Sequence, residues 1–306
     1  MMGRLRRYFL DPAGASVALE FSSSAIVGAR VEKRRGTLEL KALASEALSA
    51  GSLAPTLEDP GFVDREQIRA AIKDVLARIG ATSAARAALV VPDVLTRFRL
   101  FPNDEVKDEP KKRDAVVAFR MQKLLPFPAS ETRVVSAWPE LATDPVLALG
   151  FSSSVLSAYE QVGQAFGLDV GSVETSSMAL LRGLPSEGDV FLVRHEPSWV
   201  TLTLTRKGWP ISIRSFDGAV AGSPDEVRRE IASTAVFWRD RHSGQQLKTA
   251  VIHAGDAWYE GLGRDVNEVF GCASQRASAP RHLVVAGVPP AVERMAAPAL
   301  ALLGAS

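Results

Sequence analysis

Residues able to support nucleophilic or metal-assisted chemistry are scarce in this chain and poorly spaced for it. There is one cysteine, Cys272, and there are four histidines, no two of which are four residues apart. We therefore expect neither a zinc hydrolase with helical ligand spacing nor an intramolecular disulfide. No Gly-x-Ser-x-Gly elbow, Walker A loop or Gly-x-Gly-x-x-Gly loop occurs. The histidines are His195, His242, His253 and His282.

One adjacent pair, His195 and Glu196, has the residue types of a general base and a carboxylate partner. The pair lies in a segment with the pattern of a β-strand, and adjacent strand residues point to opposite faces of a sheet. We therefore expect no acid–base dyad at this position.

The overall composition is that of a soluble globular protein. Of the 306 residues, 46% are hydrophobic and 23% are charged, and the length suggests two domains of ~150 residues each. The 36 basic and 35 acidic residues give the whole chain no positive excess of the kind that nucleic-acid binding needs. No apolar run reaches the ~18 residues of a membrane helix. The basic N-terminal segment lacks the apolar core of a secretory signal, so we expect a cytoplasmic protein.

Two short basic clusters stand out from this charge balance. Arg4, Arg6 and Arg7 lie beside the apolar and aromatic residues 8–10, and residues 33–35 read Lys-Arg-Arg. We interpret the first cluster as a frayed leader and the second as a solvated turn. Contact with a membrane surface or a phosphate is the alternative.

The order of strand and helix patterns repeats once along the chain. Residues 15–48 have the pattern of three strands joined by short turns, and residues 189–218 repeat it. Helical patterns follow each set, at 65–79 and at 224–242. Two such halves in an α/β chain are typical of the actin, Hsp70 and sugar-kinase fold, in which two lobes clamp a nucleotide.

Several segments resemble the type IV pilus assembly protein PilM family, which has an FtsA-like version of this fold. The run VALEFSSS at 17–24 is similar to the family's opening hairpin, and AFRMQKLLPFP at 118–128 to its amphipathic helix ending in Pro-Phe-Pro. Residues 149–184 follow the family's strand, helix, turn and inter-lobe helix. The similarity extends over about 16–305. GspL-type secretion proteins and MshI-type pilus proteins share the fold and are near alternatives.

The resemblance implies two lobes with an inserted subdomain in the first. The second lobe lacks room for the insertion that full-length relatives carry there, because a short loop joins its third strand to its long helix. The expected parts are a leader at 1–14, a first lobe core at 15–93, the inserted subdomain at 94–152, a return with the inter-lobe helix at 153–188, and the second lobe at 189–306.

The first hairpin departs from the catalytic pattern of actin-like ATPases. Those enzymes use an aspartate to organise Mg²⁺ and a glycine to admit the phosphates; the resemblance places Glu20 and Ser22 at these positions. Glu20 could still hold a metal ion through water. Ser22, Ser23 and Ser24 could still donate hydrogen bonds to a phosphate. We favour a polar hairpin turn without such a role.

The second hairpin departs further from the catalytic pattern of actin-like ATPases. An Asp-x-Gly is expected there, and the resemblance places Arg194 and Glu196 at its ends. Arginine cannot act as a general base at neutral pH, and a carboxylate repels a phosphate. The third element, usually Gly-Gly, is represented by Gly255 and Asp256. We therefore expect a vestigial nucleotide cleft and a pseudo-ATPase without cofactor. Residual ATP and Mg²⁺ binding is the open alternative.

The resemblance also implies a groove for the short cytoplasmic N-terminal peptide of a PilN-like inner-membrane protein. A helix at 113–125 would supply apolar pockets and the strand at 94–102 would supply donors. We expect at least one of the two phenylalanines at 119 and 127 to belong to the core. The candidate groove residues are Arg97, Phe98, Leu100, Val116, Phe119, Arg120, Lys123, Leu124, Pro126 and Phe127.

These expectations predict a non-catalytic scaffold of a type IV pilus or related secretion machine. The chain would be peripheral to the inner membrane through its partner, and a pilus or secretion ATPase complex is a further candidate partner. The alternative is an active actin-like ATPase or a sugar-kinase-like phosphotransferase, which needs the acidic base that the second hairpin lacks.

Overall fold

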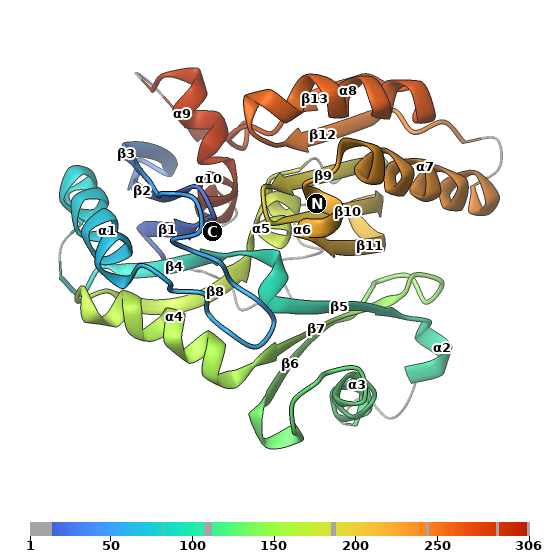
Figure 1. Cartoon of the computed structure of the whole chain (residues 1–306), viewed down its shortest axis with the longest axis horizontal. Helices are drawn as coiled ribbons and strands as arrows, with labels where there is room; N and C mark the ends of the chain where they lie inside the picture. The colour runs from blue at the N-terminus through green and yellow to red at the C-terminus, as the bar shows by residue number, and fades with distance from the viewer. Residues whose placement is uncertain are drawn as a thin grey trace. The chain divides into compact units, whose positions relative to one another are not determined.

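The chain divides into two compact units (Figure 1). Unit 1 comprises residues 1–184 and 278–306, and unit 2 comprises residues 185–277. The expected leader at 1–14 lies outside the described residues except for Gly14. The computed structural model describes residues 14–81, 83–106, 112–184, 188–242, 245–285 and 288–304.

Unit 1 is built on a mixed sheet in which the predicted meander is confirmed. In order across the sheet, its six strands are β14 (Leu283–Val284), β3 (Thr37–Ala47), β2 (Ala25–Arg34), β1 (Val17–Phe21), β4 (Arg86–Val91) and β8 (Asp169–Thr175). Strands β1, β2 and β3 pair antiparallel, while β4 runs parallel to β1. The carboxyl ends of β1 and β4 are therefore neighbours.

Helices cover both faces of this sheet. On one face, α1 (Arg65–Ile79) and α4 (Ser153–Ala165) pack against alternate strand residues such as Leu19 and Leu89. On the other face, α5 (Ser176–Gly183) and α10 (Ala297–Gly304) contribute small and aliphatic side chains to a second cluster with Ala18. The short helix α9 (Pro290–Met295) precedes α10.

Helix α1 begins and ends where its sequence predicts. The Asp64 carboxylate accepts a hydrogen bond from the Gln67 N–H at 2.9 Å, and Gly80 ends the helix in the left-handed conformation with φ of 63°. Opposite this helix, a Cβ added to Gly28 would lie 2.4 Å from the Val75 side chain. The glycine therefore allows β2 to approach α1 closely.

A second, smaller sheet occupies the region predicted as an inserted subdomain. Its three strands are β5 (Thr96–Phe101), β7 (Val146–Ser152) and β6 (Thr132–Ala137), in that order and all antiparallel. Helix α3 (Arg113–Gln122) packs on one face, where a Cβ added to Gly150 would lie 2.7 Å from the Leu125 side chain. The remaining short elements are η1 (Asp93–Leu95), α2 (Asn103–Val106) and η2 (Ala129–Glu131).

Unit 2 contains the second meander. Its five strands, in order across the sheet, are β11 (Trp209–Asp217), β10 (Trp199–Arg206), β9 (Val190–Glu196), β12 (Thr249–His253) and β13 (Ser274–Arg276). The helices α6 (Gly218–Ala221), α7 (Pro224–Arg241) and α8 (Asp256–Phe270) bury apolar residues against one face of this sheet. Because α6 follows β11 directly and α7 begins at Pro224, no additional subdomain separates strand from helix, as predicted.

The predicted extent of the second lobe, 189–306, differs from the structure at its C-terminal end. Residues 278–306 belong to unit 1 instead. The reason lies in α10, which is apolar on all sides and buried along its whole length. It packs against α5 so closely that a Cβ added to Gly183 would lie 2.8 Å from the Ala301 Cβ. Among the described residues, no helix has the length and apolar character needed to span a membrane.

Candidate functional site

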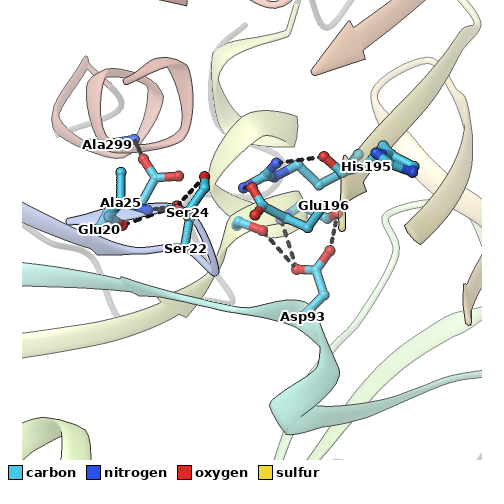
Figure 2. Close-up of polar contacts among 11 residues, drawn as sticks. Glu20, Ser22, Ser24, Ala25, Asp93, His195, Glu196 and Ala299 are labelled. Carbon is cyan, nitrogen blue, oxygen red and sulfur yellow. Dashed lines mark hydrogen bonds and ion pairs between the residues drawn. The ribbon is translucent and has the colours of Figure 1, made fainter. Parts of the chain in front are cut away.

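The turn of the first hairpin is closed by its own hydrogen bonds (Figure 2). The Ser22 N–H donates to the Ala25 carbonyl at 3.0 Å, and the Ala25 N–H donates to the Ser22 Oγ at 3.0 Å. The Ser22 hydroxyl also donates to the Ala25 carbonyl and lies 3.3 Å from the Ser24 Oγ. Ser22 is buried, so its hydroxyl is part of the turn.

Glu20 is bonded to the N-terminus of α10. It is 1% exposed, and its Oε2 accepts a hydrogen bond from the Ala299 N–H at 3.3 Å. Ala299 lies in the first helical turn, where N–H groups have no partner within the helix. A carboxylate there satisfies one donor and interacts favourably with the helix dipole.

Asp93 caps the N-terminus of α5 in the same way, although its neighbours in the sequence do not indicate this role. It is fully buried, and its Oδ1 accepts from the Ser177 N–H at 2.9 Å and the Ser176 hydroxyl at 3.3 Å. The Ser177 hydroxyl donates to Oδ2. These partners are 83 and 84 residues away in the chain, so no local sequence pattern could identify the contact.

A second buried carboxylate of unit 1 is paired with an arginine. The Arg182 Nε on α5 lies 2.8 Å from the Glu174 Oε2 on β8, and the two side chains are 3% and 7% exposed. Burial raises the pKa of Glu174, and the nearby guanidinium opposes this rise. The pair joins the C-terminal half of α5 to the sheet.

The second hairpin carries a buried ion pair between Arg194 and Glu196, the two residues that we expect at the positions of the Asp-x-Gly motif. Arg194 Nη2 lies 2.7 Å from Glu196 Oε1, and their side chains are 1% and 7% exposed. The residues are two apart on β9 and therefore share a face of the sheet. The guanidinium also lies 4.9 Å from the ring centroid of Trp199, and its Nη1 donates to the His195 carbonyl at 3.2 Å.

His195 lies on the opposite face of β9, which confirms that it forms no dyad with Glu196. Its Nε2 donates to the Ala221 carbonyl at 2.9 Å, and its ring stacks on Trp258 with centroids 4.0 Å apart. Burial lowers the pKa of His195. The imidazole is therefore a neutral core group that joins β9 to α6 and α8.

Gly255 and Asp256, the third predicted nucleotide-binding element, lie at the start of helix α8. Gly255 precedes the helix, and a Cβ added there would meet no atom within 4 Å. Asp256 is largely exposed, and its Oδ1 accepts from Arg276 Nη1 at 2.7 Å. His253 is buried within β12. Within the described ranges, no cluster of three or more His, Cys, Asp or Glu side chains could hold a metal ion.

The candidate groove residues of helix α3 and the turn after it include two exposed apolar side chains. Phe119 is 59% exposed and Leu124 is 44% exposed. The Lys123 ammonium lies 4.4 Å from the Phe119 ring centroid, and Arg120 Nη1 lies 3.0 Å from Glu105 Oε2. We call this surface, formed by Phe119, Arg120, Lys123 and Leu124, the α3 outer face.

The remaining groove candidates are divided between core and surface. Val116 and Phe127 are half-buried against the core beneath α3, which agrees with the expectation that one of Phe119 and Phe127 is a core residue. Pro126 is exposed, and α3 ends at Gln122, three residues before the predicted end at 125.

The strand residues do not all face the helix, which corrects the predicted groove. Arg97 is directly opposite Gly150, whose position lies under the Leu125 side chain, so Arg97 is on the α3 side of the sheet. Phe98 is opposite Leu149 and Leu100 is opposite Leu147, both on the other side. Strand alternation separates the two faces of a sheet but does not show which face a helix covers.

Comparisons with known proteins give the fold. No protein-family model and no curated protein matches the chain. Among solved structures, it is similar to a chain of the PilM-PilN type IV pilus biogenesis complex, with a TM-score of 0.75 and 16% sequence identity, covering 95% of this chain and 99% of that one. It is also similar to a Bacteroides thetaiotaomicron protein of unknown function with an actin-like ATPase fold, with a TM-score of 0.53 and 11% identity, covering 86% of this chain and 91% of that one. The chain has the actin-like ATPase fold.

Proposed function

We propose that the chain is a non-catalytic scaffold of a type IV pilus or related assembly machine. The main support for the absence of catalysis is the buried ion pair of Arg194 and Glu196, in which Nη2 and Oε1 are 2.7 Å apart. In an actin-like ATPase this hairpin supplies the base that activates water. A guanidinium cannot accept a proton at neutral pH, and Glu196 is bound to that guanidinium.

The contacts of the first hairpin support the same proposal. A metal-organising carboxylate must be directed at the ion or its water shell, whereas Glu20 accepts the Ala299 N–H. Phosphate binding needs free N–H or hydroxyl donors, whereas the Ser22 N–H and hydroxyl donate within the turn. These residues therefore fit the interior of a folded unit better than they fit Mg²⁺ and a triphosphate.

A scaffold needs a partner, and the comparison with a PilM-PilN complex suggests its class. We propose that the partner is a PilN-like inner-membrane protein whose short cytoplasmic peptide binds the α3 outer face. Exposed apolar groups gathered on one surface, here Phe119 and Leu124 on the α3 outer face, are typical of interaction sites. The chain would then be cytoplasmic and would reach the membrane through this partner.

The direct test is a peptide titration by calorimetry. The probe is a synthetic peptide with the cytoplasmic N-terminal sequence of a PilN-like inner-membrane protein. Binding that is weakened by Phe119→Ala and unaffected by Val236→Ala, an exposed residue on α7, would support the proposal. Absence of binding to the unmodified protein would refute this choice of partner.

A thermal shift with nucleotide tests the non-catalytic part separately. A ligand at a hundredfold excess over its Kd adds about 2.7 kcal/mol to the free energy of unfolding. We expect millimolar ATP with Mg²⁺ to leave the melting temperature unchanged. An increase of several degrees would show that the nucleotide site is intact.

A further inference from the structure

Strand β5 is an edge of the small sheet in unit 1 (Figure 1). In the described part of the chain, β7 is the one strand that pairs with it, through six consecutive residue pairs without a bulge. Because β5 has a neighbouring strand on one side only, part of its backbone N–H and C=O groups points away from the sheet. Helix α3 packs mainly over β6 and β7. The outer side of β5, which we call the β5 edge, therefore has the backbone groups that a further strand would need.

The exposed side chains of β5 are two arginines on the same face. Arg97 and Arg99 are two residues apart, and both lie on the side of the sheet that α3 occupies. Neither guanidinium has a hydrogen-bond or ion-pair partner among the residues that the structure describes. The strand thus carries two uncompensated positive charges whose Cα atoms are roughly 7 Å apart.

Other arginines around the small sheet do have carboxylate partners. Arg120 Nη1 lies 3.0 Å from Glu105 Oε2, and Arg133 Nη1 lies 3.5 Å from Glu160 Oε1. The two arginines of β5 differ from these in having no acidic side chain bound to them. Their planar guanidinium groups are therefore available to a carboxylate from outside the chain.

The opposite face of β5 carries apolar side chains. Phe98 and Leu100 lie there, and both are half-buried. A strand added to β5 would therefore meet cationic and apolar positions in alternation. Cross-strand pairs of opposite charge and of apolar side chains each stabilise a sheet. The sequence that fits this edge is one in which acidic and apolar residues alternate.

A second copy of β5 does not meet this requirement. Antiparallel pairing centred on Phe98 would place Arg97 of one copy opposite Arg99 of the other, and like charges directly opposite destabilise a sheet. A shift by one residue would place both arginines opposite apolar side chains. Proline and bulges often protect sheet edges from pairing, and β5 contains neither. The arginines therefore disfavour self-association while they favour an acidic strand.

We propose that the β5 edge binds an extended segment of a partner protein in which acidic and apolar residues alternate. The segment adds a fourth strand to the three-stranded sheet. Its carboxylates accept hydrogen bonds from Arg97 and Arg99, and its apolar residues lie beside Phe98 and Leu100. Backbone hydrogen bonds supply affinity, and the alternation supplies specificity. This site is separate from the α3 outer face and does not depend on the proposed PilN-like partner.

Calorimetric titration of the full chain with synthetic peptides tests this proposal. The probe is the capped peptide Thr-Glu-Val-Glu-Val-Glu-Thr, which has its glutamates on one face of a strand and its valines on the other. The first control peptide has lysine in place of each glutamate. The second has the same composition with the glutamates grouped together, so that the charge is kept and the alternation is lost.

Two variants of β5 and one matched control complete the design. Arg97→Thr with Arg99→Thr removes the charges and keeps a residue that favours strands. Arg97→Glu with Arg99→Glu reverses the charge. The control, Arg69→Gln with Lys73→Gln, removes the same charge from exposed positions on α1. Circular dichroism verifies the fold of each variant.

We expect the alternating acidic peptide to bind the unmodified chain and to bind less tightly as salt increases. The threonine variant should bind it about tenfold more weakly, and the α1 control should bind it as the unmodified chain does. The glutamate variant should prefer the lysine peptide. Amide hydrogen exchange of the complex should show protection in residues 96–101 and none in β6, the other edge of the small sheet.

Several results would overturn the proposal. These are an absence of binding by the acidic peptide, equal binding of the peptide with grouped glutamates, and unchanged affinity in the threonine variant. An equal loss of affinity in the α1 control would also overturn it, since the effect would then be one of net charge. Protection that appears in β6 or α3 and not in β5 would assign the peptide to another surface.

Discussion

Arg194 and Glu196 form a 2.7 Å ion pair inside unit 2, from positions two apart on the same strand. Removing one member leaves a buried charge without its counterion, which typically costs 3–5 kcal/mol. We therefore expect Glu196→Ala to lower the free energy of unfolding of unit 2 by about 4 kcal/mol. Urea denaturation followed by tryptophan fluorescence measures this change.

The matched control replaces both charges. Arg194→Met with Glu196→Leu removes the need for pairing, so it should cost much less than Glu196→Ala alone. If the double variant is as unstable as the single variant, the ion pair is not the reason for the loss.

Asp93 is expected to be a stronger helix cap than Asp64. Asp93→Ala leaves the buried Ser177 N–H without an acceptor, which costs about 1–3 kcal/mol, in addition to the loss of two hydroxyl contacts. Asp64→Ala removes one exposed cap and should cost about 1 kcal/mol. Chemical denaturation compares the two variants. Faster amide hydrogen exchange at Ser177 should accompany the first, and equal costs would contradict the assignment.

Replacing Phe119 should affect peptide binding much more than it affects the stability of the fold. Because the ring is 59% exposed, Phe119→Ala should change the free energy of unfolding by no more than about 0.5 kcal/mol. Loss of a central aromatic anchor typically weakens an interface by ~2 kcal/mol, about thirtyfold in affinity. Calorimetric titration of the PilN-like peptide checks this value.

Two further variants test where the peptide binds. Phe98→Ala should leave the affinity unchanged, because Phe98 is on the side of the sheet away from α3. Lys123→Glu should change mainly the association rate and its salt dependence. A large loss in Phe98→Ala with an intact fold would instead place the peptide on the other side of the sheet.

The stability of unit 2 should fall on acidification because of His195. Burial lowers its pKa in the folded protein, whereas the unfolded chain titrates near the ordinary value of about 6.5. Below that pH the unfolded state takes up a proton that the folded state does not. The stabilisation that comes from neutral His195 is therefore complete above a pH of about 6.5, and it is lost as the pH falls through the pKa of the folded protein.

Denaturation midpoints at several pH values from neutral to mildly acidic check this prediction. His195→Gln should flatten the dependence in this range, since glutamine can still donate to the Ala221 carbonyl. Burial also lowers the pKa of His242, the C-cap residue of α7, so His242→Gln should flatten the dependence as well and shows the part that is not due to His195. An unchanged slope in His195→Gln would contradict the assignment.

Much of the fold could be predicted from the sequence because its signals are local. The alternating strands of both meanders, the Asp64 cap and the Gly80 stop of α1 depend on neighbouring residues. The position of α10 could not be predicted in this way. An all-apolar helix has no polar face to orient it, and its packing partners in β1 and α5 are remote in sequence.

The features of the candidate site also differ in whether they follow from neighbouring residues. The opposite orientations of His195 and Glu196 follow from strand geometry alone and were predicted. The bonds from Glu20 to Ala299 and from Asp93 to Ser177 join residues far apart in the chain, so they became visible only in the folded structure. The placement of Phe98 failed for a related reason, because strand alternation defines two faces but does not say which one a helix covers.

ATP turnover measures the central claim most directly. The assay uses the purified full chain with Mg²⁺ and millimolar ATP, with and without the PilN-like peptide, alongside Glu20→Ala and Glu20→Gln. The proposed non-catalytic scaffold predicts no phosphate release above background, and any trace should be the same in all three proteins. Turnover that is present in the unmodified chain and abolished by Glu20→Ala would show that the chain is an active ATPase.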